Sequence, residues 1–164
     1  MSEHLQRIRQ KVGHDLLVLP SAAVAIHDNK NRLLLGLHAE KQLWVLPGGL
    51  IEAGELPADG AVREVWEEMG LVVELTGILG VYGGEALVIE YANGDQSSYV
   101  TVLFSGRIAS GKLSADGQEI LEARYFSQEE LHTVPHPRWV DQAIPALFSN
   151  NGKAHFQQST WNPK

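Results

Sequence analysis

Length, composition and charge limit what this chain can be. It has 164 residues, no cysteine, and a formal net charge of −7 from 13 Lys and Arg against 20 Asp and Glu. This size fits one compact domain, the missing cysteine excludes disulfides and thiolate chemistry, and the lack of a basic stripe disfavours sequence-specific nucleic-acid binding.

The first third of the chain predicts a short helix followed by sheet. Apolar residues at helical spacing among charged ones indicate an amphipathic helix over residues 2–12. Two apolar runs, 16–27 and 32–37, flank an Asp-Asn-Lys-Asn turn and predict a β-hairpin. Residues 43–46 predict a short strand that ends at a Pro-Gly-Gly turn, where glycine permits close backbone approaches.

The apolar run at 16–27 has a second interpretation, because basic residues precede it and its small residues resemble a signal-peptide cleavage site. It is too short to span a bilayer and is interrupted by Pro20 and Ser21. Asp15 interrupts the approach, and the run leads directly into the hairpin turn. We therefore favour a buried strand in a cytoplasmic protein with no membrane segment.

Residues 57–69 predict a helix. Pro57 suits the first turn, Asp59 favours the positive N-terminal end, and Gly70 stands where a C-terminal cap is expected. Apolar runs bounded by turn residues then predict further strands over 72–82, 86–92, 98–108 and 120–126.

The C-terminal part predicts two more helices and a tail. Ser127 and Glu130 have the spacing of a capping box at the start of a short helix. A second helix is predicted over 137–148, with Pro145 weakening its last part. We expect one mixed α/β domain over residues 1–148, and a polar tail over 149–164 that docks only if its aromatic residues, Phe156 and Trp161, find a surface.

Residues 49–71 concentrate the acidic charge of the chain, with six carboxylates and a single cation, Arg63. Glu64, Glu67 and Glu68 stand at i, i+3 and i+4, which places them on one helix face. Like charges this close repel, whereas Mg²⁺ and Mn²⁺ prefer such oxygen ligands. Three glutamates alone would be explained as the solvated face of an ordinary amphipathic helix, so the residues around them decide the interpretation.

Those residues follow a fixed spacing. Gly49, Glu55, Arg63-Glu64-Val65, Glu67-Glu68 and Gly70-Leu71 match the pattern Gly-x5-Glu-x7-Arg-Glu-U-x-Glu-Glu-x-Gly-U without a gap, where U is aliphatic. The segment resembles the Nudix box, the signature of the Nudix hydrolase family, which includes MutT-like proteins. The resemblance extends over roughly residues 18–132, because Trp44-x-x-Pro47-Gly48-Gly49 and the residues Glu122 to Ser127 also look like family features.

The resemblance implies a Nudix-type α/β/α sandwich around a mixed β-sheet. It also implies a Mg²⁺- or Mn²⁺-dependent pyrophosphohydrolase. The substrate would be a small nucleotide: a nucleoside diphosphate derivative of the nucleotide-sugar or ADP-ribose type, or a nucleoside triphosphate. The alternative is a non-catalytic Nudix-fold module that binds or senses a nucleotide. Whether the protein is a homodimer stays open.

Family roles carry over to matching positions of this sequence. Glu64, Glu67 and Glu68 match direct metal ligands, and the Gly48 carbonyl matches a further ligand. Four matched positions are mainly architectural, and the arginine among them would bridge to the loop carboxylate and not touch the substrate: Gly49, Glu55, Arg63 and Gly70.

The residue that removes a proton from the attacking water is left open by the resemblance. The candidates are Glu64, Glu67 and Glu119, of which Glu119 precedes a predicted strand at a position similar to one where relatives place a further acid. Glu85 is a further candidate for this role. Glu52 is either a ligand of the metal or its water network, or a solvated loop residue.

The substrate within the family is also open. Residues 84–89 carry neither the proline nor the tyrosine that marks two known subfamilies. His38 and Ala39 stand where many similar sequences place an arginine near the end of the second strand, which removes one phosphate partner.

Overall fold

The computed structural model describes residues 3–149 and 152–162. Its helices are α1 (Glu3–Val12), α2 (Pro57–Met69), α3 (Gln128–Leu131), α4 (Arg138–Phe148) and the 3₁₀ helix η1 (Glu85–Leu87). Its strands are β1 (Leu17–Ile26), β2 (Leu33–His38), β3 (Trp44–Val45), β4 (Gly48–Leu50), β5 (Leu71–Tyr82), β6 (Val88–Glu90), β7 (Gln96–Gly111), β8 (Ile120–Phe126) and β9 (His155–Phe156).

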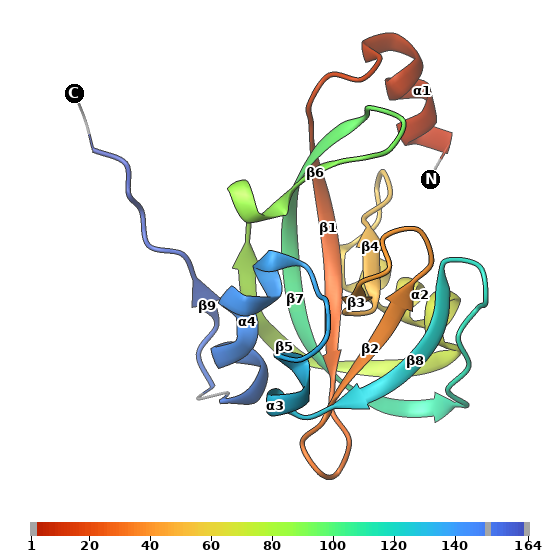
Figure 1. The fold of residues 1–164 in the computed structure, drawn as a ribbon, viewed down its shortest axis with the longest axis vertical. Coiled ribbons are helices and arrows are strands. Elements are labelled where there is room, and N and C mark those ends of the chain that lie inside the picture. The colour runs from red at the N-terminus through yellow and green to blue at the C-terminus, as the bar shows by residue number, and fades with distance from the viewer. Residues whose placement is uncertain (1–2, 150–151, 163–164) are drawn as a thin grey trace.

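The strands form two sheets. The larger has the order β4-β1-β7-β5-β9, with β6 added to β7, and the smaller has the order β3-β2-β8. Strand β1 runs parallel to β7 and antiparallel to β4, so the larger sheet is mixed, as expected from the sequence. Figure 1 shows the long strands β1 and β7 side by side at the centre of the molecule, with α1 at one end of them.

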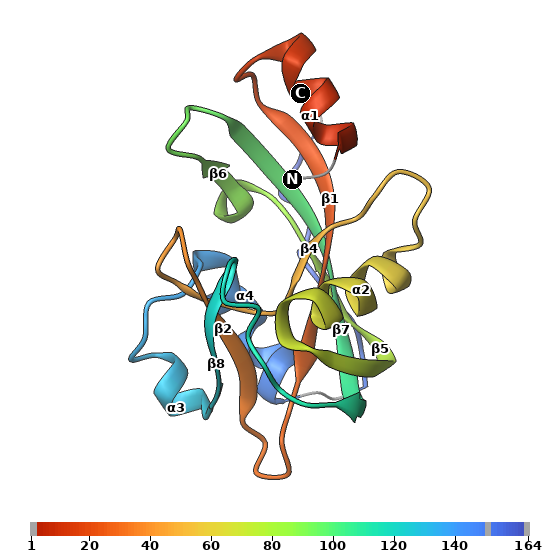
Figure 2. The ribbon, with the colours of Figure 1, turned by 90° about the vertical axis from the view of Figure 1, so that its right-hand side faces the viewer.

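Helices cover both faces of this strand assembly. Successive residues of β1 point to opposite faces of the sheet. Val24 packs in one core cluster with Val65 of α2, and Ala25 packs in the other with Val140 of α4. The three leucines 33–35 of β2 are all fully buried, as expected for a strand covered on both faces. Figure 2 shows α2 beside β1 and β7 in the view that exposes this layering. The predicted α/β/α sandwich is confirmed.

The expected hairpin over residues 16–37 is wrong in its strand pairing. The turn forms, because the Asp28 carboxylate accepts hydrogen bonds from the Lys30 and Arg32 N–H groups. The two strands then separate, since β1 pairs with β4 and β7 while β2 pairs with β3 and β8. Only an isolated bridge between His27 and Leu33 joins them among the described residues. The ten-residue parallel pairing with β7 outweighs the local hairpin.

Most other predicted elements agree with the structure. Gly48 and Gly49, which we expected in a turn, instead begin strand β4 and pair with β1. Helix α2 begins and ends at the predicted residues, and Ser127 and Glu130 make both bonds of the capping box. The strand expected over 86–92 is shorter, because η1 occupies its start and a turn at Asn93 and Gly94 ends it early. Helix α4 continues through Pro145 to Phe148.

The tail docks through its backbone, and not by burying the aromatic side chains that we expected to find a surface. Strand β9 pairs parallel with β5, and the His155 ring stacks on Tyr82 with centroids 5.4 Å apart. Phe156 and Trp161 remain 65% and 76% exposed. The domain boundary at residue 148 stays a prediction.

None of the helices within the described ranges is long and apolar enough to cross a membrane.

Candidate active site

Helix α2 carries the acidic residues, and its sequence explains how it is oriented. Ala61, Val65 and Met69 recur at i, i+4 and i+8 and are fully buried against the sheet. Gly70 adopts the left-handed conformation (φ 65°) at the C-terminal cap, and its N–H donates to the Trp66 carbonyl. Packing of this stripe fixes which glutamates face the protein and which face solvent.

Two glycines let the backbone of β4 lie directly against this helix and against β1. Gly48 has φ 149°, and a Cβ atom there would lie 2.3 Å from the Ala22 carbonyl oxygen. At Gly49 an added Cβ would lie 2.6 Å from the carboxyl carbon of Glu64. Gly48 therefore requires glycine, whereas a side chain at Gly49 would displace the Glu64 carboxylate, so the acidic helix meets bare backbone.

Glu68 lies in the contact between α2 and β4. It is 4% exposed, and the Gly48 N–H donates to its Oε2 at 3.0 Å. Burial raises the pKa of Glu68 to about 9, while the bond from Gly48 opposes the rise. The charges of Glu64, Glu119 and Asp116 raise the pKa further. A cation bound here would therefore offset both the cost of burying the Glu68 charge and its repulsion by the neighbouring carboxylates.

Glu64 and Glu67 lie further along the same face, but they are not equally buried. The side chain of Glu64 is 16% exposed, and burial raises its pKa. The side chain of Glu67 is 55% exposed. Arg63 bonds both of them through Nη1, at 2.8 Å to Glu64 Oε1 and 3.0 Å to Glu67 Oε2.

Arg63 also ties the helix to the loop before it. Its Nε and Nη2 donate to the two carboxylate oxygens of Glu55 at 2.9 and 3.0 Å, and Nη2 also donates to the Leu50 carbonyl at 3.0 Å. The hydrogen bonds to Glu55 raise the pKa of Arg63, and the same bonds lower the pKa of Glu55. The Glu55 carboxylate in turn accepts the Glu52 N–H at 2.9 Å. This network gives the loop its shape.

Glu119 reaches the site on a loop that is fastened to the end of α2. The Ser114 and Asp116 N–H groups donate to the carbonyls of Met69 and Glu68 at 3.0 and 3.2 Å. The side chain of Glu119 is 63% exposed, and its charge acts on both Glu64 and Glu68. The structure thus brings Glu119 near the acidic helix.

The other two candidates are placed differently. Glu85 is exposed in η1, and its charge is not among those that shift the pKa of Glu64 or Glu68. Glu52 is half-buried, and its backbone N–H and carbonyl both bond to Glu55. Within residues 3–149 and 152–162, no three Asp, Glu or His side chains converge into a formed metal site.

The donor set nevertheless suits a hard divalent cation. The carboxylates of Glu64 and Glu68 are largely shielded from water beside the backbone of Gly49 and Gly48, and burial is the main cause of their raised pKa values. Mg²⁺ and Mn²⁺ prefer this ligand chemistry, and both retain waters that could occupy the remaining positions.

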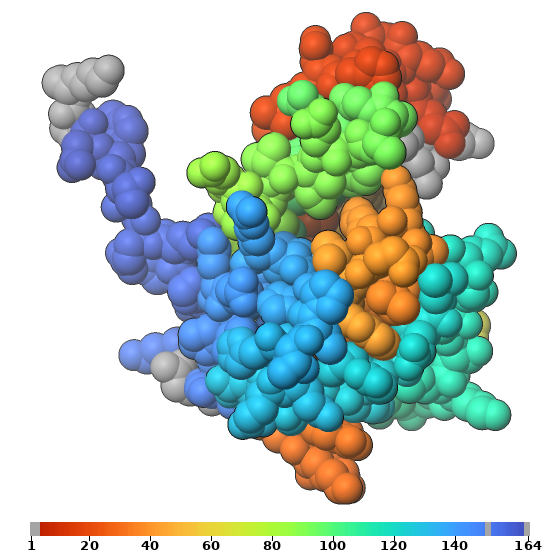
Figure 3. Space-filling view, in the orientation of Figure 1, coloured from red at the N-terminus to blue at the C-terminus, as the bar shows by residue number. Residues whose placement is uncertain are grey.

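Lys41, on the loop after β2, is the centre of a cluster that residue spacing did not reveal. Lys41 lies with its Nζ 5.5 Å from the ring centroid of Tyr91, and the Tyr91 hydroxyl bonds that of Tyr99 at 2.5 Å. His38 Nε2 lies 3.7 Å from Glu119 Oε1. Figure 3 shows this loop, in orange, between the green turn around residues 88–96 and the teal segment near residues 112–119. No sequence spacing connects these three segments.

Two large aromatic side chains, Tyr82 and Trp139, lie in the core and do not face the acidic helix. Tyr82 and Trp139 are buried against each other with ring centroids 5.5 Å apart.

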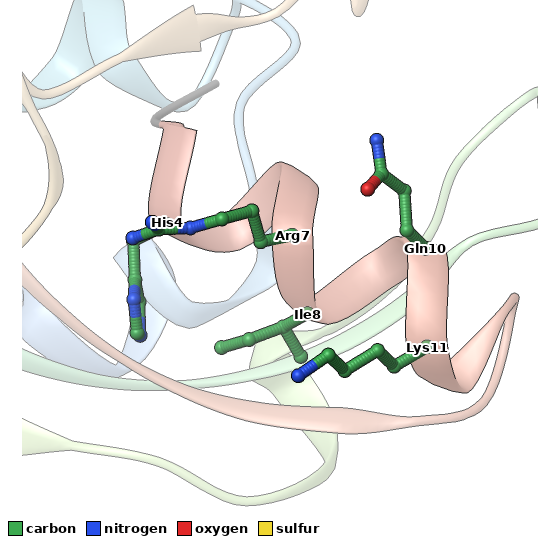
Figure 4. Close-up of a pocket in the computed structure, with 5 residues that line it drawn as sticks. All are labelled: His4, Arg7, Ile8, Gln10 and Lys11. Carbon is green, nitrogen blue, oxygen red and sulfur yellow. The ribbon is translucent and has the colours of Figure 1, made fainter.

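A hollow on the molecule is lined by residues of α1 alone: His4, Arg7, Ile8, Gln10 and Lys11. Gln10 points away from the other four (Figure 4). The hollow holds no acidic residue and lies apart from α2.

Comparison with known proteins agrees with this geometry. The NUDIX domain model matches residues 18–147. A MutT-like protein of Streptomyces ambofaciens is 44% identical over 61 residues, which are 37% of this chain and 39% of that protein. A putative 8-oxo-dGTP diphosphatase of Bacillus subtilis (strain 168) is 32% identical over 110 residues, 67% of each chain. An ADP-ribose pyrophosphatase of Methanocaldococcus jannaschii is 28% identical over 134 residues, 79% of this chain and 75% of that one.

Solved structures share the fold. A MutT protein from Methanosarcina mazei Go1 has a TM-score of 0.68 at 25% identity, covering 85% of this chain and 99% of that chain. A NUDIX hydrolase from Nitrosomonas europaea has a TM-score of 0.69 at 23% identity, covering 87% and 98%. Nudix hydrolases generally use divalent metal ions and act on small nucleotide derivatives. The domain match and the named relatives support classification as a pyrophosphohydrolase. This chain, matched by the domain model over most of its length and folded around an acidic helix against a Gly-Gly strand, belongs to the NUDIX family.

Proposed function

We propose that the chain is a Mg²⁺- or Mn²⁺-dependent pyrophosphohydrolase that cleaves a diphosphate linkage in a nucleoside diphosphate derivative or a nucleoside triphosphate. The observation that carries this proposal is the burial of Glu68 and Glu64 against Gly48 and Gly49. Burying carboxylates that repel one another is costly unless a cation is bound there.

Glu64, Glu67 and Glu68 would hold the metal, with the Gly48 carbonyl as a further ligand. The bound ion supplies neutralisation of phosphate charge and activation of water. Gly49 leaves room for Glu64 to approach the backbone, while Glu55 and Arg63 keep the loop and the helix in register. Gly70 ends α2, and the loop after β7, which carries Glu119, bonds to the carbonyls of Met69 and Glu68 at that end of the helix.

A carboxylate must accept the proton of the attacking water. Glu119 is the candidate that the geometry favours over Glu85, because its charge acts on the buried glutamates while its side chain stays largely open to solvent. Glu64 and Glu67 remain alternatives, and both are held by Arg63. A solvent-accessible base beside the metal ligands can exchange its proton with water after each turnover.

The relatives indicate which substrates to try first. The named activities of two relatives are those of an 8-oxo-dGTP diphosphatase and an ADP-ribose pyrophosphatase. We propose a substrate of one of these two classes for this chain. Cytoplasmic location stays a prediction, and whether the protein is a homodimer stays open.

The test is hydrolysis of ADP-ribose, a nucleotide sugar, 8-oxo-dGTP and dGTP with Mg²⁺ or Mn²⁺, with products identified by mass. We expect cleavage of at least one compound, and a loss of about 100-fold or more in kcat for Glu68→Gln. The matched control is Glu129→Gln, which changes a surface glutamate of α3 and should leave kcat unchanged. A nucleotide that binds the wild-type protein with Mg²⁺ but stays intact for hours would instead support the non-catalytic module.

A further inference from the structure

Lys41 is a cation held in a defined position by the loop after β2. Its backbone N–H donates to His38 Nδ1 at 3.3 Å, and the Gln42 N–H donates to the His38 carbonyl at 2.9 Å. Gln42 has φ 52°, and its side-chain amide donates to the Ala39 carbonyl at 2.6 Å. A turn closed by these bonds limits where the lysine stem can point.

The ammonium group of Lys41 lies between aromatic and acidic surroundings. It lies over the Tyr91 ring, whose hydroxyl is fixed by Tyr99. The charges of Glu119, Glu40 and Glu68 act on it, yet none of the carboxylates in the described part of the chain comes within ion-pair distance of it. Lys41 is half-buried, so its charge loses part of its contact with water, and this burial lowers the pKa of Lys41.

The partial burial of Lys41 and its lack of a close carboxylate together indicate an anionic ligand. A cation that loses hydration without gaining a close ion pair is costly unless a negative group binds beside it. The ends of β2 and β8 bring it near Glu119 and Glu68, so a diphosphate held by metal at α2 would extend toward this loop. Ammonium groups bind phosphate oxygens as compact point charges.

We propose that Lys41 binds a phosphate oxygen of the substrate, with Tyr91 holding the lysine stem in place. The proposal rests on the proposed function for the location of the diphosphate. Lys41 is a substrate-binding residue in this arrangement and transfers no proton.

Binding of inorganic pyrophosphate in the presence of Mg²⁺, measured by isothermal titration calorimetry, tests this without requiring turnover. We expect Lys41→Met, which keeps the apolar stem over Tyr91, to weaken binding about tenfold or more, as for loss of one hydrogen bond to a charged group. Lys41→Arg keeps the charge and should recover most of the affinity. The matched control is Lys30→Met, which removes an exposed lysine from the turn at residues 28–31 and should bind pyrophosphate like the wild type.

With the substrate that the hydrolysis panel identifies, Lys41→Met should raise KM with kcat within about threefold of the wild type, the sign of a contact made equally in ground and transition states. If Lys41→Met fails to fold, Lys41→Gln gives the same measurement. Unchanged pyrophosphate affinity in a folded, charge-neutral variant overturns the inference and leaves a purely structural cation. Absence of pyrophosphate binding by the wild type with either metal overturns it as well. If the wild type hydrolyses no compound of the panel but Lys41→Met still weakens pyrophosphate binding, Lys41 is upheld as an anion site and the proposed hydrolase is refuted.

Discussion

At Gly49 the backbone of β4 approaches α2 so closely that no side chain fits between them. A Cβ atom there would lie 2.6 Å from the Glu64 carboxyl carbon. Gly49→Ala should therefore push the Glu64 carboxylate out of position and lower kcat/KM about tenfold or more, since small displacements of a catalytic group are costly. Because Gly49 has no positive φ, we expect little change in the midpoint of thermal unfolding.

The matched control for this substitution is Gly77→Ala. An added Cβ at Gly77 would make an ordinary contact of 3.7 Å with the Ser105 hydroxyl, so activity should be retained. If Gly49→Ala retains wild-type kcat/KM, the contact between Gly49 and Glu64 has no role in the reaction.

Single residues also show where reasoning from spacing stops. The i, i+3, i+4 spacing correctly placed Glu64, Glu67 and Glu68 on adjacent positions of one helix. It did not reveal that Glu68 is buried while the side chain of Glu67 is more than half exposed. Helical spacing fixes the direction in which each side chain leaves the helix. The strand that packs on that side decides how deeply the side chain is buried.

At the scale of elements, Arg63 joins α2 to the loop over residues 51–56. Arg63→Gln would leave the Glu55 carboxylate without its two-point partner and the Leu50 carbonyl without a donor. We expect the free energy of unfolding to fall by about 1–2 kcal/mol, a value reduced for the partial exposure of the pair. Equilibrium unfolding in urea measures it.

Arg107→Gln provides the comparison for this prediction. Arg107 pairs with Glu74 across β5 and β7, but both side chains are more than half exposed. Loss of an exposed pair changes stability by less than about 1 kcal/mol. Equal changes in the two variants would mean that the Arg63 network does not stabilise the fold.

Elements with local signals were predicted well, and elements decided by distant partners were not. Helix α2 has Pro57 at its start and Gly70 at its cap, so both ends are encoded locally. The pairing of β1 depends on β7, more than 70 residues later, which local turn chemistry at Asp28 cannot indicate. Strand β9 depends on the exposed edge of β5 and had no sequence signal of its own.

At the scale of the whole molecule, the site is assembled from segments that only the fold brings together. The Nudix box supplied α2 and β4 from one contiguous stretch, so their residues could be named from sequence. Lys41 and Tyr91 come from separate loops, and their contact follows from how β2 and the β6–β7 turn pack. Residues outside the family signature are brought together only by the fold, so the signature alone left the substrate open.

The stability of the whole molecule should depend on pH through His27, at the end of β1. Its Nε2 is buried without a hydrogen-bond partner in the described part of the chain, and its ring packs edge-on against Phe148 of α4 with centroids 5.7 Å apart. Burial lowers the pKa of His27, although the charge of Asp28 acts in the opposite direction. The folded state therefore holds the neutral ring more strongly than the unfolded state does.

The sign of the effect follows from this difference. Below the unfolded pKa of about 6.5, the unfolded chain binds a proton at His27 that the folded chain does not, so stability falls as pH decreases toward the lowered folded pKa. In urea unfolding at pH 7.5, 6.5, 5.5 and 5.0, the wild type should lose more stability on acidification than His27→Leu, whose side chain cannot titrate. His4→Leu, which removes an exposed histidine of α1, should follow the wild-type curve. Parallel curves for the wild type and His27→Leu would show that the acid sensitivity arises elsewhere.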